Sequence, residues 1–279
     1  MSAHIFDCRK IAEEHLFRVR EELSGLKGRP SLAVLSKEED SPSSVYRNMI
    51  MKDAAALGIP ISDIRAADCG ALELQIKAAN ADPGIKGIMV MYPLGFKKKD
   101  DDIMDLIDPR KDVEGMHSIN FGYLIKYKRF LDEGPGSKCV VPATAKAIVK
   151  TIQHYAIPIE RSFSVIVNNS MRIGKPLGLM LENLGATVVK CYDRTKREDL
   201  EAAIAKADIL VTAVPDKNFR IPPDIVKKGA VVLDASFEGN LNYDELREKA
   251  SFITSPGNRI GKVTRAMIFT NFSYCSKYG

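Results

Sequence analysis

The chain has 279 residues, of which 45% are hydrophobic and 28% are charged, and its formal net charge is +5. This profile is typical of a globular protein with one large or two modest domains. Basic residues are scattered, and the one dense run, at 97–99, is followed at once by three aspartates at 100–102, so we expect no nucleic-acid partner.

Helical and strand patterns alternate at short spacing in the first half of the chain, which is typical of a parallel sheet with crossover helices. In chain order, the predicted elements are a helix over residues 3–26, a strand over 31–35, helices over 42–57 and 71–79, a strand over 87–92 and a helix over 102–107. Residues 108–141 have no regular pattern, and Gly134-Pro135-Gly136 within them is a strong breaker. We therefore place a domain boundary near these residues.

The second half continues the alternation in a βαβ rhythm. Its predicted elements are a helix over residues 142–155, a strand over 164–167, a helix that opens at 174–176, a strand over 186–192, a helix over 196–206, strands over 208–213 and 229–234, and helices over 243–250 and 264–272, after which the tail frays. Four strands in this rhythm predict a Rossmann-type parallel sheet.

The segment from Ser162 to Arg194 is one strand–loop–helix–strand unit, and it carries most of the functional signal. Free backbone N–H groups at the helix start would attract a pyrophosphate. Asp193, about 20 residues beyond the loop, follows the second strand and can accept hydrogen bonds from an adenosine ribose. The loop has one glycine where the usual fingerprint has three. The unit therefore predicts a dinucleotide site that favours NAD, with an ordinary crossover as the alternative.

Two further strands end in residues that suit a cofactor site, because ligands of open α/β sheets lie beyond the carboxyl ends of the strands. These ends are Ala213-Val214-Pro215 and Asp234-Ala235-Ser236. Taken singly, each is equally compatible with a plain turn.

Several site classes are not expected. No apolar run approaches the length of a bilayer, and the N-terminal helix pattern lacks the apolar core of a secretory signal, so we expect a cytoplasmic protein with no membrane partner. The five cysteines and four histidines contain no CxxC pair and no ligand spacing, so we expect neither a disulfide nor a metal site.

Seven segments, in order, resemble the methylenetetrahydrofolate dehydrogenase/cyclohydrolase family over nearly the whole chain. They are SPSSVYRNMIMKDAAALGI (41–59), NADPGIKGIMVMYPL (80–94), DPRKDVEGMHSINFGYL (108–124), VPATAKAIVKTI (141–152), SVIVNNSMRIGKPLGLMLENLGATV (164–188), ADILVTAVPDKNF (207–219) and GKVTRAMI (261–268). The resemblance implies two α/β domains with a cleft between them. Residues 1–138 plus 265–279 would form a folate-binding catalytic domain, to which the last helix returns, and residues 139–264 an NAD-binding Rossmann domain. It also implies a homodimer.

Five positions depart from the bifunctional members of that family. Ile50 stands where they carry a lysine, Met91 where they carry a glutamine, and Glu114 where they carry an aspartate. The cofactor loop begins with Asn168 in place of glycine, and Asp193 replaces a serine that helps to hold the NADP phosphate. Together with residues 113–115, 213–215 and 261–264, these departures resemble the monofunctional NAD-dependent branch, which lacks cyclohydrolase activity.

The resemblance implies roles for two groups of residues. Glu114 and Tyr46 would be catalytic, and a tetrahydrofolate derivative would be bound by Tyr46, Met91, Tyr92, Pro93, Asp112 and Glu114. NAD would be bound by Asn169, Ser170, Arg172, Ile173, Asp193, Arg194, Ala213, Val214, Ala235, Ser236 and Thr264. Arg172 and Arg194 could instead pair with a phosphate, but Asp193 stands where a ribose contact is expected, which favours NAD. Lys52, six residues from Tyr46, would point away from it on a helix and is expected to be a solvated surface lysine.

The main hypothesis is therefore an NAD-dependent 5,10-methylenetetrahydrofolate dehydrogenase without useful cyclohydrolase activity. Two alternatives stay open. The chain could be a folate- or nucleotide-binding homologue that has lost its activity, as the changes at Ile50, Met91 and Asn168 suggest, or a dehydrogenase that acts on another pterin one-carbon carrier.

Overall fold

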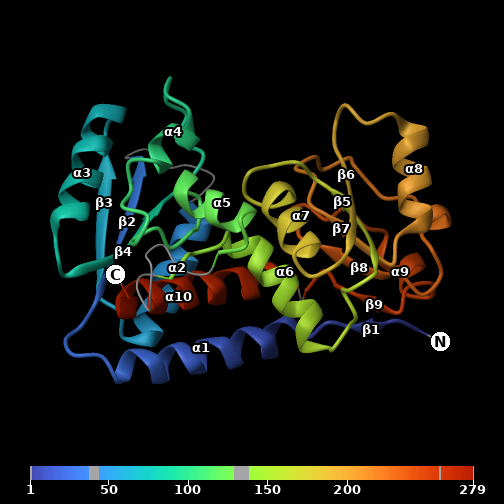
Figure 1. Ribbon diagram of the computed structural model, residues 1–279, viewed down its shortest axis with the longest axis horizontal. Helices are drawn as coiled ribbons and strands as arrows, with labels where there is room; N and C mark the ends of the chain where they lie inside the picture. The colour runs from blue at the N-terminus through green and yellow to red at the C-terminus, as the bar shows by residue number, and fades with distance from the viewer. Residues whose placement is uncertain (1, 38–43, 129–137, 258, 279) are drawn as a thin grey trace. The chain divides into compact units, whose positions relative to one another are not determined.

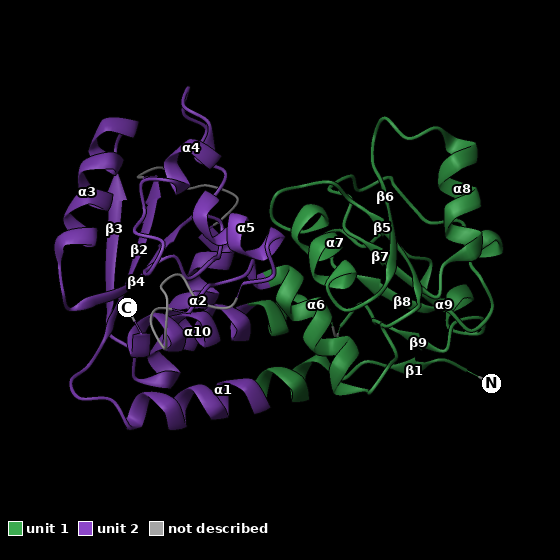
Figure 2. Ribbon diagram, viewed as in Figure 1, with its two compact units in different colours: residues 1–13, 144–264 green, residues 14–143, 265–279 purple. Residues whose placement is uncertain are grey.

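The computed structural model describes residues 2–37, 44–128, 138–257 and 259–278. The chain divides into two compact units, coloured in Figure 2: residues 1–13 and 144–264 form unit 1, and residues 14–143 and 265–279 form unit 2. The expected boundaries placed the N-terminal residues with the first domain. In the structure, residues 1–13 belong to unit 1, because the chain begins as a strand of that unit's sheet.

Unit 1 is built on a six-stranded, fully parallel sheet in the order β1-β9-β8-β7-β5-β6. The strands are β1 (His4–Ile5), β5 (Phe163–Val167), β6 (Thr187–Cys191), β7 (Ile209–Thr212), β8 (Val231–Asp234) and β9 (Phe252–Ile253). The helices are α6 (Ala143–His154), α7 (Gly174–Glu182), α8 (Arg197–Lys206) and α9 (Tyr243–Leu246), with a 3₁₀ turn, η1 (Pro223–Ile225). All residues of β7 and β8 are buried, as expected for central parallel strands covered on both faces.

Phe6, Tyr155 and Phe252 form an aromatic cluster that anchors the N-terminus on unit 1. Their ring centroids lie 5.2–5.5 Å apart, and the Asp7 backbone N–H donates to the Tyr155 hydroxyl at 2.8 Å. β1 pairs in parallel with β9, and α1 (Cys8–Ser24) begins only after it. The predicted helix over residues 3–26 is therefore wrong at its start, because pairing with a strand almost 250 residues away overrides the local helical pattern.

Unit 2 contains a three-stranded parallel sheet in the order β3-β2-β4, formed by β2 (Ser31–Lys37), β3 (Ile61–Ala66) and β4 (Ile85–Val90). The helices are α2 (Ser44–Leu57), α3 (Cys69–Ala81), α4 (Asp100–Met104) and α5 (Ser118–Ile125). α3 runs alongside β3 and β2 (Figure 1). β3 and α5 were not predicted. The predicted helix start at Pro42 and the breaker at 134–136 lie outside the described residues.

The last helix, α10 (Gly261–Tyr278), contributes its residues from Arg265 onward to unit 2. Arg265 forms an ion pair with Asp53 at 2.6 Å, and the Asn271 side-chain amide donates to the Val113 carbonyl at 2.9 Å. The tail expected to fray beyond Phe272 is helical instead. Its Ser273 and Cys275 side chains are buried, so packing within unit 2 supports the helix where its sequence alone does not.

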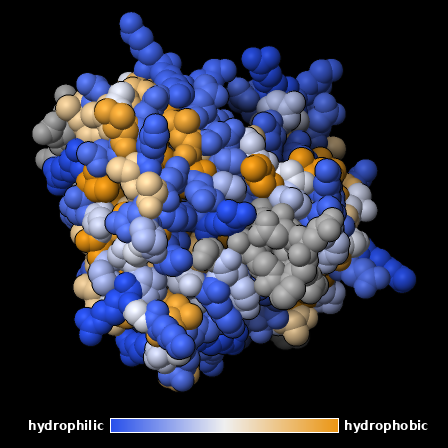
Figure 3. Space-filling view, turned by 60° about the vertical axis from the view of Figure 1, so that its left-hand side comes forward, coloured by the Kyte–Doolittle hydropathy of each residue, from blue (hydrophilic) through white to orange (hydrophobic). Residues whose placement is uncertain are grey.

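No helix among the described residues is both long enough and apolar enough to cross a membrane. The face shown in Figure 3 carries hydrophobic side chains in small groups between hydrophilic ones.

Candidate functional site

The loops that follow β5 and β7 lie where the chain reverses its direction across the sheet of unit 1. From β5 the chain passes through α7 to β6 on one side, and then crosses back through α8 to β7 on the other side of β5. In open α/β sheets, such a switch point separates the loops at the carboxyl ends of the strands and receives the ligand. Most of the predicted cofactor residues follow β5, β6, β7 or β8, whereas Thr264 lies on α10 (Gly261–Tyr278).

Asn168 is the first residue after β5, and its side chain organises the loop. Its Oδ1 accepts hydrogen bonds from the Ser170 N–H at 2.9 Å, the Ser170 hydroxyl at 2.7 Å and the Gly174 N–H at 2.9 Å. Its Nδ2 donates to the Ala213 carbonyl beyond β7 at 2.7 Å. One side chain thus shapes the loop and joins it to the neighbouring strand end.

Gly174 is required where α7 begins, because its backbone lies directly against this loop. A Cβ atom at this position would stand 2.0 Å from the Asn168 carbonyl oxygen and 2.8 Å from the Asn169 nitrogen, so any side chain would force the helix away. Close packing of helix on strand is the role of one glycine of the dinucleotide fingerprint. The single glycine of this loop therefore fills that role.

The start of α7 is less open than the sequence predicted. The Ile173 N–H donates to the Ser170 hydroxyl at 3.2 Å, and the Lys175 N–H donates to the Ser170 carbonyl at 3.0 Å. Among the described residues of the loop, the backbone N–H groups of Asn169 and Met171 donate no hydrogen bond. A pyrophosphate would thus meet the loop rather than the first turn of the helix, and Ser170 acts inside the loop.

Asp193 follows β6 on a tight turn and is exposed, as is Arg194. The turn is closed by Tyr192 and Thr195, since the Tyr192 N–H donates to the Thr195 hydroxyl and the Thr195 N–H donates to the Tyr192 carbonyl, both at 2.9 Å. Within the described residues, the Asp193 carboxylate forms no hydrogen bond or ion pair. Its two oxygens are therefore available to ribose hydroxyls.

The ends of β7 and β8 are joined by Asn240, which the sequence analysis did not single out. Its buried Oδ1 accepts from the Thr212 hydroxyl at 2.9 Å and the Val214 N–H at 2.8 Å, and its own N–H donates to Asp234 at 2.7 Å. Asp234 also accepts from the N–H and the hydroxyl of Ser236. The pair Gly239-Asn240 signals a turn, but nothing local indicates that its amide reaches back to β7.

Two predicted cofactor residues therefore use their hydroxyls internally. The Ser236 hydroxyl donates to Asp234 at 2.6 Å, and the Thr264 hydroxyl donates at 3.3 Å to the carbonyl of Ile260, the residue just before its helix. Ala213, Val214 and Ala235 line the loops held by Asn168, Asn240 and Asp234.

In unit 2, Asp112 has no exposed surface, which differs from its expected contact with substrate. Its carboxylate accepts from the N–H groups of Glu114 at 3.1 Å, Gly115 at 2.9 Å and His117 at 2.8 Å, and from the Asn120 side-chain amide at 3.1 Å. Burial raises the pKa of Asp112, and these hydrogen bonds oppose that shift. Asp112 shapes the loop that carries Glu114.

Glu114 is half-buried on a loop that is held from several directions. Gly115 has φ +71°, and a Cβ there would lie 2.4 Å from the Val141 carbonyl carbon, so only glycine fits. The Ala143 N–H donates to the Glu114 carbonyl at 3.3 Å. The carboxylate therefore extends from a fixed backbone.

The other predicted pterin residues lie on α2 and just after β4. Ile50 is fully buried on the same face of α2 as Ala54, Tyr46 is half-buried one turn before it, and Lys52 is exposed, as expected. Met91 is buried and donates its N–H to the Leu35 carbonyl at 2.8 Å.

Tyr92 is half-buried, with its hydroxyl on the Met104 sulfur, and Pro93 is exposed. Ile88 of β4 is bridged to Asp112, so the residues after β4 and the Glu114 loop belong to one edge of the unit 2 sheet.

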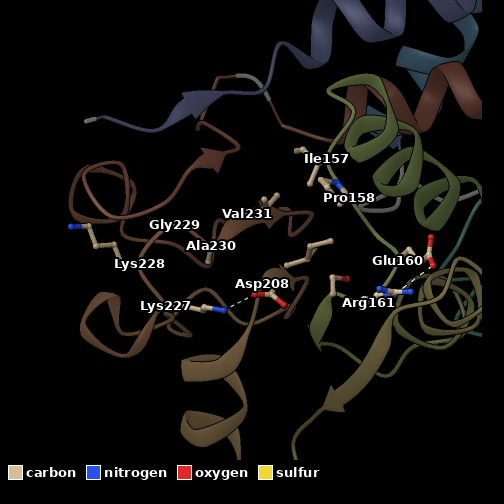
Figure 4. A pocket seen from close by; sticks show the side chains of 12 residues that line it. Ile157, Pro158, Glu160, Arg161, Asp208, Lys227, Lys228, Gly229, Ala230 and Val231 are labelled. Carbon is tan, nitrogen blue, oxygen red and sulfur yellow. Dashed lines mark hydrogen bonds and ion pairs between the residues drawn. The ribbon is translucent and has the colours of Figure 1, made fainter.

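A cavity of about 450 Å³ lies at the opposite, amino end of the unit 1 strands, where Ser162, Asp208 and Ala230 precede β5, β7 and β8 (Figure 4). Its charges are mostly paired: Lys227 contacts Asp208 at 2.5 Å, and Arg161 faces Glu160 at 3.8 Å. Lys228 points away from the other labelled side chains (Figure 4). None of the predicted site residues lines this cavity. Among the described residues, no group of three or more His, Cys, Asp or Glu side chains could hold a metal ion.

The comparisons with known proteins cover nearly the whole chain. Residues 6–114 match the tetrahydrofolate dehydrogenase/cyclohydrolase catalytic domain, and residues 142–278 match the NAD(P)-binding domain of the same family. A curated relative, the bifunctional protein FolD of Xanthomonas euvesicatoria, is 35% identical over 286 residues, which is 97% of this chain and 91% of the relative.

Two solved structures superpose on almost all of the fold. The 5,10-methylenetetrahydrofolate dehydrogenase of the silkworm Bombyx mori has a TM-score of 0.88 at 28% identity, over 99% of this chain and 98% of the other. The bifunctional FolD of Campylobacter jejuni has a TM-score of 0.87 at 28% identity, over 99% of both chains. The chain belongs to the tetrahydrofolate dehydrogenase/cyclohydrolase family.

Proposed function

We propose that this protein is an NAD-dependent 5,10-methylenetetrahydrofolate dehydrogenase with little or no cyclohydrolase activity. Membership of the family supports the folate substrate and the dinucleotide. The observation that carries the choice of NAD is the exposed carboxylate of Asp193, which lies two residues after the end of β6 and has no partner within the described residues.

The preference for NAD follows from charge. NADP carries an additional phosphate on the adenosine ribose, and a carboxylate at that position repels it, whereas two ribose hydroxyls can donate hydrogen bonds to the same carboxylate. Arg194 is the opposing influence, because a guanidinium binds phosphate well. The Asp193 carboxylate lies one residue closer than Arg194 to the end of β6, where the ribose is expected. We therefore expect its repulsion of the NADP phosphate to exceed the attraction by Arg194.

The unit 1 loops fit the dinucleotide. Gly174 lets α7 begin close against the loop, and the N–H groups of Asn169 and Met171 donate no hydrogen bond within the described residues, so they remain available for a pyrophosphate. When bound, the nicotinamide ring supplies the hydride acceptor. Asn168 and Asn240 would keep the surrounding strand ends in place.

Dehydrogenation needs positioning more than acid–base chemistry. A hydride leaves the methylene carbon of the substrate, and the lone pairs of the two flanking nitrogens stabilise the cation that results, so this step moves no proton. Holding the reacting atoms at near-attack distance can lower a barrier by ~7–11 kcal/mol. A carboxylate favours developing positive charge, and Glu114 on its fixed loop is our candidate for that role. Tyr46, Met91, Tyr92 and Pro93 would contact the pterin.

Cyclohydrolase action does require proton transfer, because water adds to the methenyl cation and the ring then opens. Ile50 occupies the position that matches the family's lysine, and it is a fully buried core residue of α2. Loss of such a proton-transfer group typically costs ~10²–10⁴ in rate. Lys52 is exposed and lies six residues from Tyr46, so it would point away from Tyr46 on α2 and we expect no replacement.

Steady-state kinetics with 5,10-methylenetetrahydrofolate and NAD or NADP test this proposal, with hydrolysis of methenyltetrahydrofolate followed in parallel. The proposal predicts NADH formation and hydrolysis at the buffer rate. Tight binding of folate and NAD without turnover would support the inactive homologue instead, and turnover with methanopterin but not folate substrates would support the other carrier. Hydrolysis above the buffer rate that is lost in Lys52→Ala would contradict the assignment to the monofunctional branch.

A homodimer and a cytoplasmic location also remain predictions. Light scattering on the purified chain tests the first, and cell fractionation tests the second.

A further inference from the structure

Among the described residues of unit 1, the exposed tyrosine and phenylalanine side chains lie at one edge of its sheet. Among the described residues of this unit, three large hydrophobic side chains are exposed: Ile5, Tyr192 and Phe237. The two aromatic ones follow β6 and β8, at the carboxyl ends of these strands, and Phe237 is 87% exposed. This is the edge at which parallel α/β sheets bind their ligands.

The backbones beneath both rings are fixed. Arg259 donates from its guanidinium to the Phe237 carbonyl, the Ser236 hydroxyl and N–H are bound to Asp234, and the Gly239 N–H donates to the Ser236 hydroxyl at 2.9 Å. Tyr192 is held by its two hydrogen bonds with Thr195. Each exposed ring is therefore carried by an ordered turn rather than by a frayed loop.

The order of the strands separates the two rings in the way a dinucleotide requires. β6 and β8 lie three strand positions apart, with β5 and β7 between them, which is a separation of roughly 14 Å. The Asn168 loop, where a pyrophosphate would lie, falls between them. Tyr192 adjoins Asp193 on the adenosine side, and Phe237 therefore lies on the nicotinamide side.

We propose that Tyr192 and Phe237 bracket the dinucleotide, with Tyr192 stacked on the adenine and Phe237 against a face of the nicotinamide ring. This inference rests on the proposed dinucleotide-binding function and adds two residues that determine how the rings are held. Every base offers a flat π-face to an aromatic side chain. The oxidised nicotinamide is also a cation, which is attracted to the face of a phenyl ring, so Phe237 would favour NAD⁺ over NADH.

Isothermal titration of the full chain with four probes tests the inference: NAD⁺, NADH, nicotinamide mononucleotide and ADP-ribose. Phe237→Ala is expected to weaken NAD⁺ and the mononucleotide by roughly 2- to 12-fold, to affect NADH less, and to leave ADP-ribose unchanged. Tyr192→Ala is expected to weaken NAD⁺ and ADP-ribose by a similar factor and to leave the mononucleotide unchanged. Phe17→Ala, at an aromatic residue of α1 that is 62% exposed, is the matched control and should bind all four like the wild type.

The outcomes separate this inference from the function on which it rests. If the wild type binds neither NAD nor NADP, the proposed function fails. If the wild type binds the dinucleotide and both variants bind every probe as well as the wild type does, only the proposed contacts of Tyr192 and Phe237 are wrong. A Phe237→Ala variant with unchanged affinities but an altered mass by light scattering would show that a second copy of the chain covers the ring, and this would also overturn the inference. The thermal midpoints should stay within a few degrees of the wild type, because both rings are solvent-exposed.

Discussion

The side-chain amide of Asn168 donates a hydrogen bond to the carbonyl of Ala213 at 2.7 Å, and so joins the loops after β5 and β7 across the switch point of the unit 1 sheet. The same side chain accepts three hydrogen bonds from its own loop. Asn168 is therefore a structural anchor of the candidate cofactor site.

Replacement of this anchor should loosen the loop. Asn168→Ala leaves the Ala213 carbonyl and the N–H groups of Ser170 and Gly174 without their partner, and we expect a loss of ~1–3 kcal/mol in the free energy of unfolding, together with weaker NAD binding. Urea unfolding measures the first effect. The matched control is Asn169→Ala, whose side chain makes no hydrogen bond within the described residues and whose stability should change little. Equal midpoints for the two variants would contradict the role of Asn168.

Asp112 should matter for stability rather than for direct contact with substrate. Asp112→Ala leaves the N–H groups of Gly115 and His117 buried without an acceptor and removes one of the two acceptors of the Asn120 side-chain amide, so we expect a loss of ~3–5 kcal/mol. Asp108→Ala, which removes a single hydrogen bond to the exposed Arg110 N–H, is the control and should cost less than ~1 kcal/mol. A stable Asp112→Ala protein with a raised KM for the folate substrate would contradict this prediction and would support the substrate contact that the sequence suggested.

Glu114 should act on the chemical step. Glu114→Gln keeps the shape of the side chain but removes the charge that would favour the developing cation, and we expect kcat of the dehydrogenase to fall by roughly 10² while the Kd for NAD stays the same. Glu114→Asp, the residue that the resemblance implies for the bifunctional members, should recover part of the rate. A Glu114→Gln enzyme with wild-type kcat would exclude an electrostatic role.

Two buried thiols predict a loss of stability in alkali. Burial raises the pKa of Cys8 and of Cys139 to about 12, whereas the unfolded chain releases these protons near pH 9. A pKa that is raised in the folded state gives stability that is complete below the unfolded pKa and is lost as the pH rises toward 12. We expect each thiol to cost ~1 kcal/mol between pH 9 and pH 10. Urea unfolding at pH 9 and at pH 10 measures this loss. The free energy of unfolding should decrease less in Cys8→Ala and in Cys139→Ala than in the wild type, and an equal decrease in all three proteins would contradict this prediction.

The sequence predicted those elements whose pattern is local. The run from Ser164 to Val167 is buried throughout and lies between clear turn signals, so β5 could be recognised without any partner. β1 and β9 have two residues each and exist only because they pair with each other and with β8. β3 mixes polar and apolar residues, Ile61–Ala66, because much of this edge strand faces solvent. The last turns of α10 depend on packing within unit 2, which no local pattern encodes.

The same distinction applies to the candidate site. Asp193 could be placed from its distance to the preceding loop, because the βαβ unit fixes that spacing. The bonds from Asn168 to Ala213 and from Asn240 to Thr212 span 45 and 28 residues, and they arise only from the order of the strands. Asp112 matched a family motif, but a motif cannot tell whether a carboxylate faces a ligand or its own loop.

The preference for NAD tests the central claim most directly. The measurement is kcat/KM for NAD and for NADP, side by side at saturating 5,10-methylenetetrahydrofolate, in the wild type and in Asp193→Ser. The Asp193 carboxylate predicts that the wild type favours NAD by about tenfold or more, and that the variant loses most of this preference because the repulsion of the ribose phosphate is gone. A wild type that uses NADP as well as NAD, or a ratio that Asp193→Ser leaves unchanged, would contradict the account.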